Sequence, residues 1–81
     1  MNADEQLTPR QNEVLVFISD YIDGHGYSPS HQDITDGFGW SSTQAAIDHL
    51  YHLGRKGYIE YTPRVARSIR LTGKQVVIRK Q

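Results

Sequence analysis

A row of hydrogen-bonding side chains lies along one face of the helix predicted over residues 43–56. The row consists of Gln44, Asp48, Tyr51 and Arg55. Residues three or four apart share a helix face, so these side chains would all meet the same surface. A glutamine amide pairs with adenine, an aspartate accepts a hydrogen bond from cytosine, and an arginine binds phosphate. The row therefore favours contact with the bases and backbone of a nucleic acid.

Neighbours of this row fit the same interpretation. Ile47 is apolar yet lies beside the polar row, where it suits the methyl group of thymine. Ser41 or Ser42 is predicted to cap the helix, and a cap at Ser42 directs free backbone N–H groups at a phosphate. Lys56 at the other end suits backbone anchoring, although a base there also stabilises the helix dipole.

Two histidines on the same helix raise the alternative of a metal site. His49 and His52 are three residues apart, with Asp48 beside them. The chain offers no well-spaced further ligand and contains no cysteine, so we expect these histidines to be polar surface residues. Serine, histidine and aspartate are all present, but without a nucleophile elbow or an ordered triad pattern. We therefore expect no enzyme activity, no metal and no cofactor.

The charge of the chain is zero overall but is unevenly divided along the sequence. Residues 1–40 hold seven acidic residues and one basic residue, whereas residues 41–81 hold two acidic and eight basic residues. This division can present a basic face to phosphates while the whole molecule stays neutral. The alternative is a chance division of ordinary surface charge.

Two further helices are predicted before the helix over 43–56. Thr8 and Pro9 are typical of a helix start, and Gly24 and Gly26 predict its end, so the first helix should span about 9–23. Ser30 should cap a second, short helix that ends at Gly39. The second and third helices, joined by a tight turn, form a helix-turn-helix.

The third helix and the turn before it must also contribute to the core. Ala46, Leu50 and Leu53 repeat at helical spacing and predict a buried stripe opposite the polar row. Trp40 in the turn is expected to be partly buried, with stacking on a base as the alternative.

A β-hairpin is predicted after the third helix, because the apolar period changes from 3.6 to 2. The strands should lie within residues 58–62 and 68–72. Residues expected to face the core are Ile59, Tyr61, Ile69 and Leu71. The loop over 63–67 carries Arg64 and Arg67, which suit phosphates or a narrow minor groove. The fold class is therefore α+β, a winged helix-turn-helix with three helices and a two-stranded wing.

The domain organisation is simple. We expect residues 1–6 to form a flexible arm, residues 7–73 the winged helix-turn-helix domain, and residues 74–81 a tail. Within the tail, the apolar run 76–78 is either a short strand of the fold or a dimerisation element. No apolar run is long enough for a membrane span, and the polar start is unlike a signal peptide, so a cytoplasmic location is expected.

Several segments resemble the N-terminal DNA-binding domain of the LexA repressor family. They are LTPRQNEV (7–14), GYSPS (26–30), AAIDHL (45–50), RKGYIE (55–60) and SIRL (68–71). The resemblance implies operator binding as a dimer, and repression of transcription. It also implies base contacts by Ser42, Gln44, Ala45, Ile47 and Asp48, and a wing contact by Arg67.

The chain also departs from that family pattern. Family members usually have asparagine where this chain has Gln44, and often an acidic residue where it has Ile47, so its target sequence should differ. The self-cleaving domain of the family is missing from these 81 residues. We expect a stand-alone relative from a phage or mobile element, or an excised domain. Its dimerisation would come from the tail or from contacts on DNA.

The sequence thus predicts a sequence-specific, double-stranded DNA-binding transcriptional regulator. Residues expected to contact DNA are Ser42, Thr43, Gln44, Ala45, Ile47, Asp48, Tyr51, Arg55, Lys56, Arg64 and Arg67. The alternative is a protein-interaction module that acts on a host regulator, such as full-length LexA, or on RNA polymerase. The acidic half, residues 1–40, would then be its working face.

Overall fold

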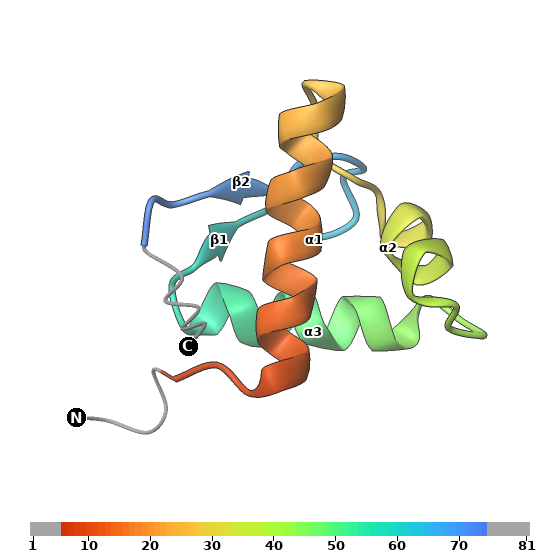
Figure 1. Cartoon of the computed structure of the whole chain (residues 1–81), viewed down its shortest axis with the longest axis horizontal. Helices are drawn as coiled ribbons and strands as arrows, with labels where there is room; N and C mark the ends of the chain where they lie inside the picture. The colour runs from red at the N-terminus through yellow and green to blue at the C-terminus, as the bar shows by residue number, and fades with distance from the viewer. Residues whose placement is uncertain (1–5, 75–81) are drawn as a thin grey trace.

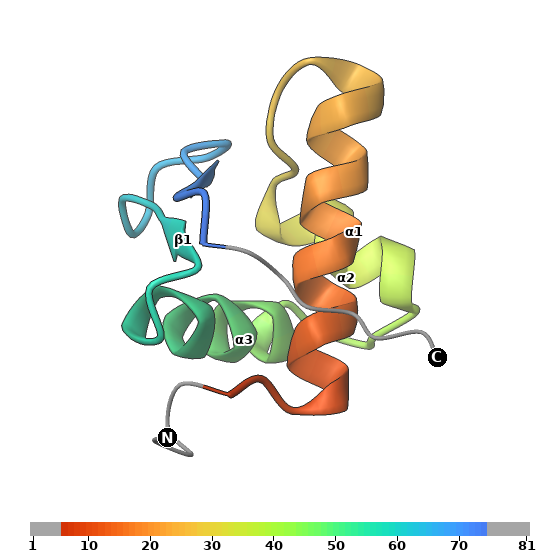
Figure 2. The same ribbon diagram turned by 60° about the vertical axis from the view of Figure 1, so that its left-hand side comes forward.

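The computed structural model describes residues 6–74 and has three helices followed by a β-hairpin (Figure 1). The elements are α1 (Pro9–His25), α2 (His31–Phe38), α3 (Gln44–Arg55), β1 (Ile59–Glu60) and β2 (Arg70–Leu71). α3 crosses behind the N-terminal half of α1 in Figure 1; α2 lies near the first turn of α3 and the hairpin near its last turn (Figures 1 and 2). This order and arrangement confirm the winged helix-turn-helix fold.

Local capping determines where α1 begins and ends. The Thr8 side chain accepts a hydrogen bond from the backbone N–H of Gln11, whose own side chain accepts from the Thr8 backbone N–H, a capping box. The predicted end near residue 23 is too early. Gly24 continues the helix, and Gly26, with a φ of 82°, takes the left-handed conformation that ends it.

α2 is capped as predicted, but the start of α3 differs from the prediction. Ser30 and Asp33 form a capping box at the start of α2, and Gly39, with a φ of 71°, ends it. The N-cap of α3 is Thr43, and neither predicted serine occupies that position. Thr43 has helical backbone angles, which differ from the extended ones that a side-chain cap uses, and it makes no capping hydrogen bond.

One continuous core joins the helices to the hairpin. Its fully or nearly fully buried side chains are Val14, Leu15, Ile18, Ile34, Ala46, Leu50, Leu53, Ile59 and Ile69. The predicted stripe on α3 is therefore confirmed. Because this stripe is buried, the opposite face of α3, which carries Gln44, Asp48, Tyr51 and Arg55, is directed toward solvent.

The hairpin is shorter than the sequence predicts. β1 and β2 pair antiparallel, with Ile59 opposite Leu71 and Glu60 opposite Arg70. The prediction that Leu71 faces the core is wrong, because its side chain is 41% exposed. α3 packs against β1, so β2 is the outer strand of the pair and receives little cover from the helix.

Candidate nucleic-acid interface

The outer face of α3 and its preceding turn carry most of the residues expected to touch DNA. Exposed side chains on this surface are Ser42, Gln44, Ile47, Asp48, Tyr51, His52 and Arg55. Two of them are large and apolar or aromatic: Ile47 is 38% and Tyr51 51% exposed. Thr43 and Ala45, also expected in the interface, are only half-buried. The exposed side chains expected to contact DNA therefore lie together on one solvent-facing surface of α3.

Within this row the first two polar side chains are linked to each other. The Gln44 side-chain amide donates to Asp48 Oδ1 at 3.0 Å, one helical turn away. The remaining amide N–H and carbonyl of Gln44 stay open for pairing. At the start of the helix, Ser42 Oγ accepts from the Gln44 backbone N–H over a long 3.4 Å.

The row ends in a cation that lies near an aromatic ring. The guanidinium carbon of Arg55 lies 5.9 Å from the centre of the Tyr51 ring, one turn earlier on α3. Among residues 6–74 no ion pair involves Arg55. Its donors are therefore free to meet a phosphate, which suits the role expected from the sequence.

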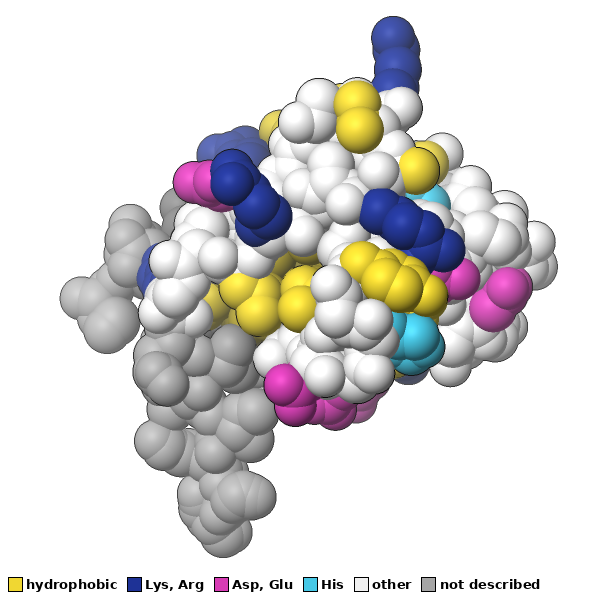
Figure 3. All heavy atoms as spheres, turned by 90° about the horizontal axis from the view of Figure 1, so that it is seen from above, with side chains coloured by type: hydrophobic (Ala, Val, Ile, Leu, Met, Phe, Trp, Pro, Cys, Tyr) yellow, Lys and Arg dark blue, Asp and Glu magenta, His cyan; other side chains and the backbone are white. Residues whose placement is uncertain are grey.

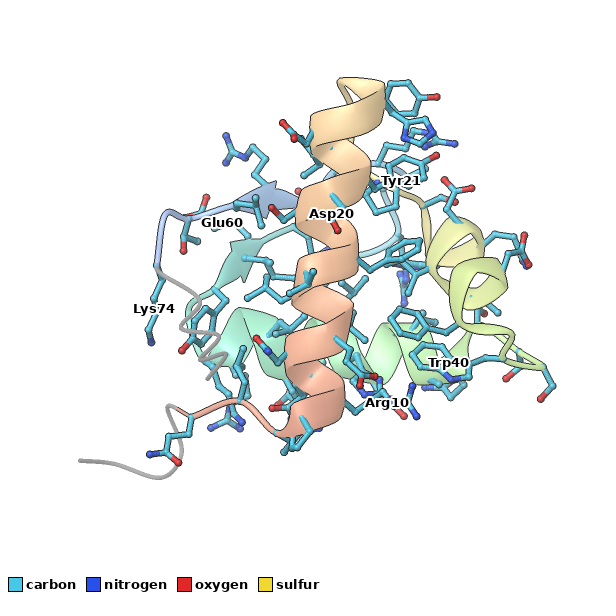
Figure 4. The ribbon with its side chains drawn as sticks, in the orientation of Figure 1. Arg10, Asp20, Tyr21, Trp40, Glu60 and Lys74 are labelled. Carbon is cyan, nitrogen blue, oxygen red and sulfur yellow. The ribbon has the colours of Figure 1, made fainter. Side chains whose placement is uncertain are left out.

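Lys56 has structural partners that the sequence analysis missed. Its ammonium donates to the backbone carbonyl of Gln6 at 2.6 Å and to Gln11 Oε1 at 2.7 Å. Lys74 in turn donates to the Lys56 carbonyl at 2.8 Å, from the end of the hairpin (Figure 4). Lys56 thus ties the segment before α1 to the end of α3, and its expected phosphate contact stays a prediction.

The two arginines of the hairpin loop have unusual backbone angles. Arg64 has a φ of 69° and Arg67 a φ of 57°, in the left-handed region that non-glycine residues rarely adopt. Hydrogen bonds inside the loop support this geometry: the Thr62 N–H donates to Ser68 Oγ at 2.9 Å, and the Val65 N–H donates to the Thr62 carbonyl at 3.1 Å. Arg64 is exposed, as a wing contact requires.

Arg67 is also exposed, but its guanidinium is turned toward the helices. Its Nη1 donates to the carbonyl of Ser28 at 2.9 Å and lies 3.0 Å from Asp33 Oδ2, while its guanidinium carbon lies 4.8 Å from the centre of the Tyr27 ring. The wing contact expected of Arg67 stays a prediction, since the structure does not bring this side chain together with the α3 row. No sequence signal pointed to the pairing of Arg67 with Asp33, because the two residues are 34 positions apart along the chain.

The aromatic turn before α3 is part of the packing. Trp40 is half-buried and stacks between Phe38 and His49, with ring centres 4.8 Å and 5.2 Å apart (Figure 4). His49 Nδ1 lies 2.8 Å from the Ala45 carbonyl.

In the part of the chain that the structure describes, no group of three or more His, Asp or Glu side chains is placed to hold a metal ion. The same residues contain no helix long and apolar enough to cross a membrane.

A helix-turn-helix whose second helix exposes a polar row, followed by a hairpin, defines the class of winged helix-turn-helix DNA-binding domains. Residues 4–68 match the model of the LexA DNA binding domain family. The chain belongs to this family. Predictions that fall on residues 1–5 and 75–81, including the strand or dimerisation element at 76–78, lie outside the described residues.

LexA repressors are among the curated relatives of this chain. That of Pseudomonas aeruginosa (strain LESB58) is 45% identical over 69 residues, which is 85% of this chain and 34% of the relative. That of Pseudomonas chlororaphis is 46% identical over 68 residues, or 84% of this chain and 34% of the relative. The chain therefore spans about a third of the length of the curated relatives it matches.

Proposed function

We propose that this domain binds double-stranded DNA sequence-specifically and represses transcription. The outer face of α3 reads the major groove, and the loop of the hairpin contacts the backbone or the minor groove. The observation that carries this proposal is the exposed row from Gln44 to Arg55, opposite a stripe of α3 that is fully buried. Repression is supported by the relatives, which are named LexA repressors.

The chemistry of the row supports base reading. Gln44 and Asp48 lie in the first half of α3, the part of a recognition helix that meets base edges. Ile47 beside them offers an apolar contact for a thymine methyl. Arg55 at the far end lies where a recognition helix leaves the groove and meets the backbone.

We further propose that two copies bind together on DNA. One recognition helix covers only a few base pairs, so winged helices of this kind gain specificity by occupying two half-sites about one helical turn apart. The bound sites should then contain an inverted repeat.

The first experiment selects bound duplexes from a random double-stranded DNA library and then titrates the best duplex at about 50 and 200 mM salt. We expect enrichment of one sequence with two half-sites, and affinity that falls steeply with salt because phosphates release counterions. Arg55→Ala should lower the salt slope by about one. Arg70→Ala removes one positive charge from β2, where Arg70 pairs with Glu60 at 3.0 Å, and is the matched control.

A lack of enrichment at low salt would contradict DNA binding by this domain. The search would then move to a protein partner, with Asp20, Asp23 and Asp36 of the acidic half as the first residues to substitute; all three are exposed. If Arg70→Ala lowered the slope as much as Arg55→Ala, the assignment of the DNA-binding face to α3 would be wrong.

A further inference from the structure

We propose that Asp33 is a positioning residue for DNA binding: by holding Arg67, it fixes the hairpin loop against the helix-turn-helix. This inference rests on the proposed function for its consequence on DNA, while the contact itself is a property of the free domain. It assigns a role to an acidic residue at the start of α2 that does not itself face the α3 row.

A single carboxylate oxygen joins three parts of the fold. Asp33 Oδ2 accepts hydrogen bonds from the Tyr21 hydroxyl and from the Ser30 backbone N–H, each at 3.0 Å. The same oxygen lies 3.0 Å from Arg67 Nη1. Tyr21 projects from α1 toward α2 (Figure 4). The oxygen therefore connects α1, the N-terminus of α2 and the hairpin loop.

The other contacts of Arg67 are directed at the same corner. Its Nη1 also donates to the carbonyl of Ser28, a residue that is only 5% exposed, and its guanidinium covers the Tyr27 ring. The loop reaches behind α1 toward the start of α2 (Figure 1). Figure 3 views this end of the molecule, where basic side chains lie beside acidic and hydrophobic ones.

The hairpin depends on such a contact because its own pairing is short. Each strand has two residues, and the loop carries Val65, which is 52% exposed. A two-stranded hairpin is at best marginally stable alone. The left-handed φ of Arg67 is a further sign that its surroundings determine the loop conformation.

The charge state of the carboxyl group agrees with this role. The Ser30 backbone N–H has the largest effect and lowers the pKa of Asp33 below its ordinary value. Burial, the second effect in size, raises the pKa in part, and the Tyr21 hydroxyl, the Ser30 hydroxyl and the Arg67 charge lower it further. Asp33 is therefore ionised at neutral pH, where it attracts the guanidinium.

The proposal makes a prediction of unusual sign. Removing an acidic residue from a DNA-binding protein should strengthen binding to the polyanion if only overall charge matters. If Asp33 positions the wing, Asp33→Asn weakens binding instead. Asparagine keeps an acceptor for Ser30 and Tyr21, so the capping of α2 survives while the charge that holds Arg67 is lost.

The experiment measures affinity for the selected duplex in a double-mutant cycle. Asp33→Asn and Arg67→Ala should each weaken binding by about tenfold, and the double variant should be no weaker than Arg67→Ala alone. The matched control is Glu60→Gln, which removes the carboxylate partner of Arg70 inside the hairpin and should leave affinity unchanged or slightly higher. Tighter binding by Asp33→Asn, or additive losses, would overturn the proposal.

Amide hydrogen exchange of the free protein tests the contact without DNA. Asp33→Asn should speed exchange at the Thr62 and Val65 amides by a larger factor than at the core amide of Leu53, whose rate reports the global stability. Unchanged exchange in the loop would refute the positioning role even if DNA binding held. If no duplex binds but loop exchange rises, the proposed function fails and the contact between Asp33 and Arg67 stands. Asp33→Glu, which restores the charge, should recover part of the protection.

Discussion

The side-chain amide of Gln44 donates a hydrogen bond to the carboxylate of Asp48 at 3.0 Å, one turn further along α3. Both side chains are exposed on the face opposite the buried stripe. The same arrangement recurs on α2, where Gln32 donates to Asp36 Oδ1 at 2.8 Å over the same spacing. The two pairs are chemically matched, but only the first lies on the proposed reading face.

This match gives the first prediction, on base preference. Asp48→Ala removes an acceptor for cytosine and also the partner of the Gln44 side-chain amide, which can then pair with another base. The free-energy difference between the preferred base and the other bases at one position of the site should therefore fall by about 1–3 kcal/mol. Competition between the selected duplex and single-base variants measures this. Asp36→Ala should leave the base preference unaltered, and a similar loss in that variant would show that the pair on α3 has no special role.

A second prediction separates the reading face from the core on the same helix. Ile47→Ala should leave the free energy of unfolding within about 0.5 kcal/mol of wild type, because the side chain is 38% exposed. It should weaken the preference for thymine at one position. Leu50→Ala, three residues later and fully buried, should cost about 2–5 kcal/mol of stability. Denaturant unfolding measures the loss of stability, and the binding competition measures the loss of base preference, for both variants.

Glycines in α1 and α2 supply a third prediction. A Cβ at Gly37 would collide with the Phe17 ring, which packs between the two helices against Phe38 with ring centres 5.4 Å apart. Gly37→Ala should therefore destabilise the domain by about 1–3 kcal/mol. Gly24 has no atom within 4 Å of such a Cβ and lies in α1, so Gly24→Ala should stabilise by about 0.5–1 kcal/mol. Thermal unfolding of both variants is the measurement, and equal shifts would contradict it.

The fourth prediction concerns pH. Because the pKa of Asp33 is lowered in the folded protein, chiefly by the Ser30 N–H, its contribution to stability is present above the unfolded pKa and is lost as the pH falls through the folded value. Wild type should exceed Asp33→Asn in stability at pH 7, and the difference should shrink below about pH 4. Denaturant unfolding at pH 7, 5 and 3 measures the gap.

The control for the pH series is Asp20→Asn, which removes one exposed carboxylate from α1 (Figure 4). It reports the general effect of losing a negative charge. If the stability difference between wild type and Asp33→Asn widened toward acid pH, its sign would contradict a lowered pKa of Asp33 in the folded protein.

Local chemistry along the chain determined much of this fold. The caps at Thr8 and Ser30, the left-handed end at Gly39 and the buried stripe of α3 were all predictable. Each depends on backbone geometry within a few residues or on a periodic pattern in one helix, so the sequence carries the signal directly. The exposed row from Gln44 to Arg55 follows, since burying one face of a helix exposes the other.

Tertiary structure alone decided what the basic residues outside that row do. Lys56 reaches Gln6 and Gln11, and Arg67 reaches Asp33, across separations of 34 to 50 residues. A cation near a helix end or in a loop looks the same in sequence whether it faces solvent or an acceptor brought in by packing. The partner of such a cation depends on how α1, α2 and the hairpin pack around the core, and no local sequence pattern determines that packing.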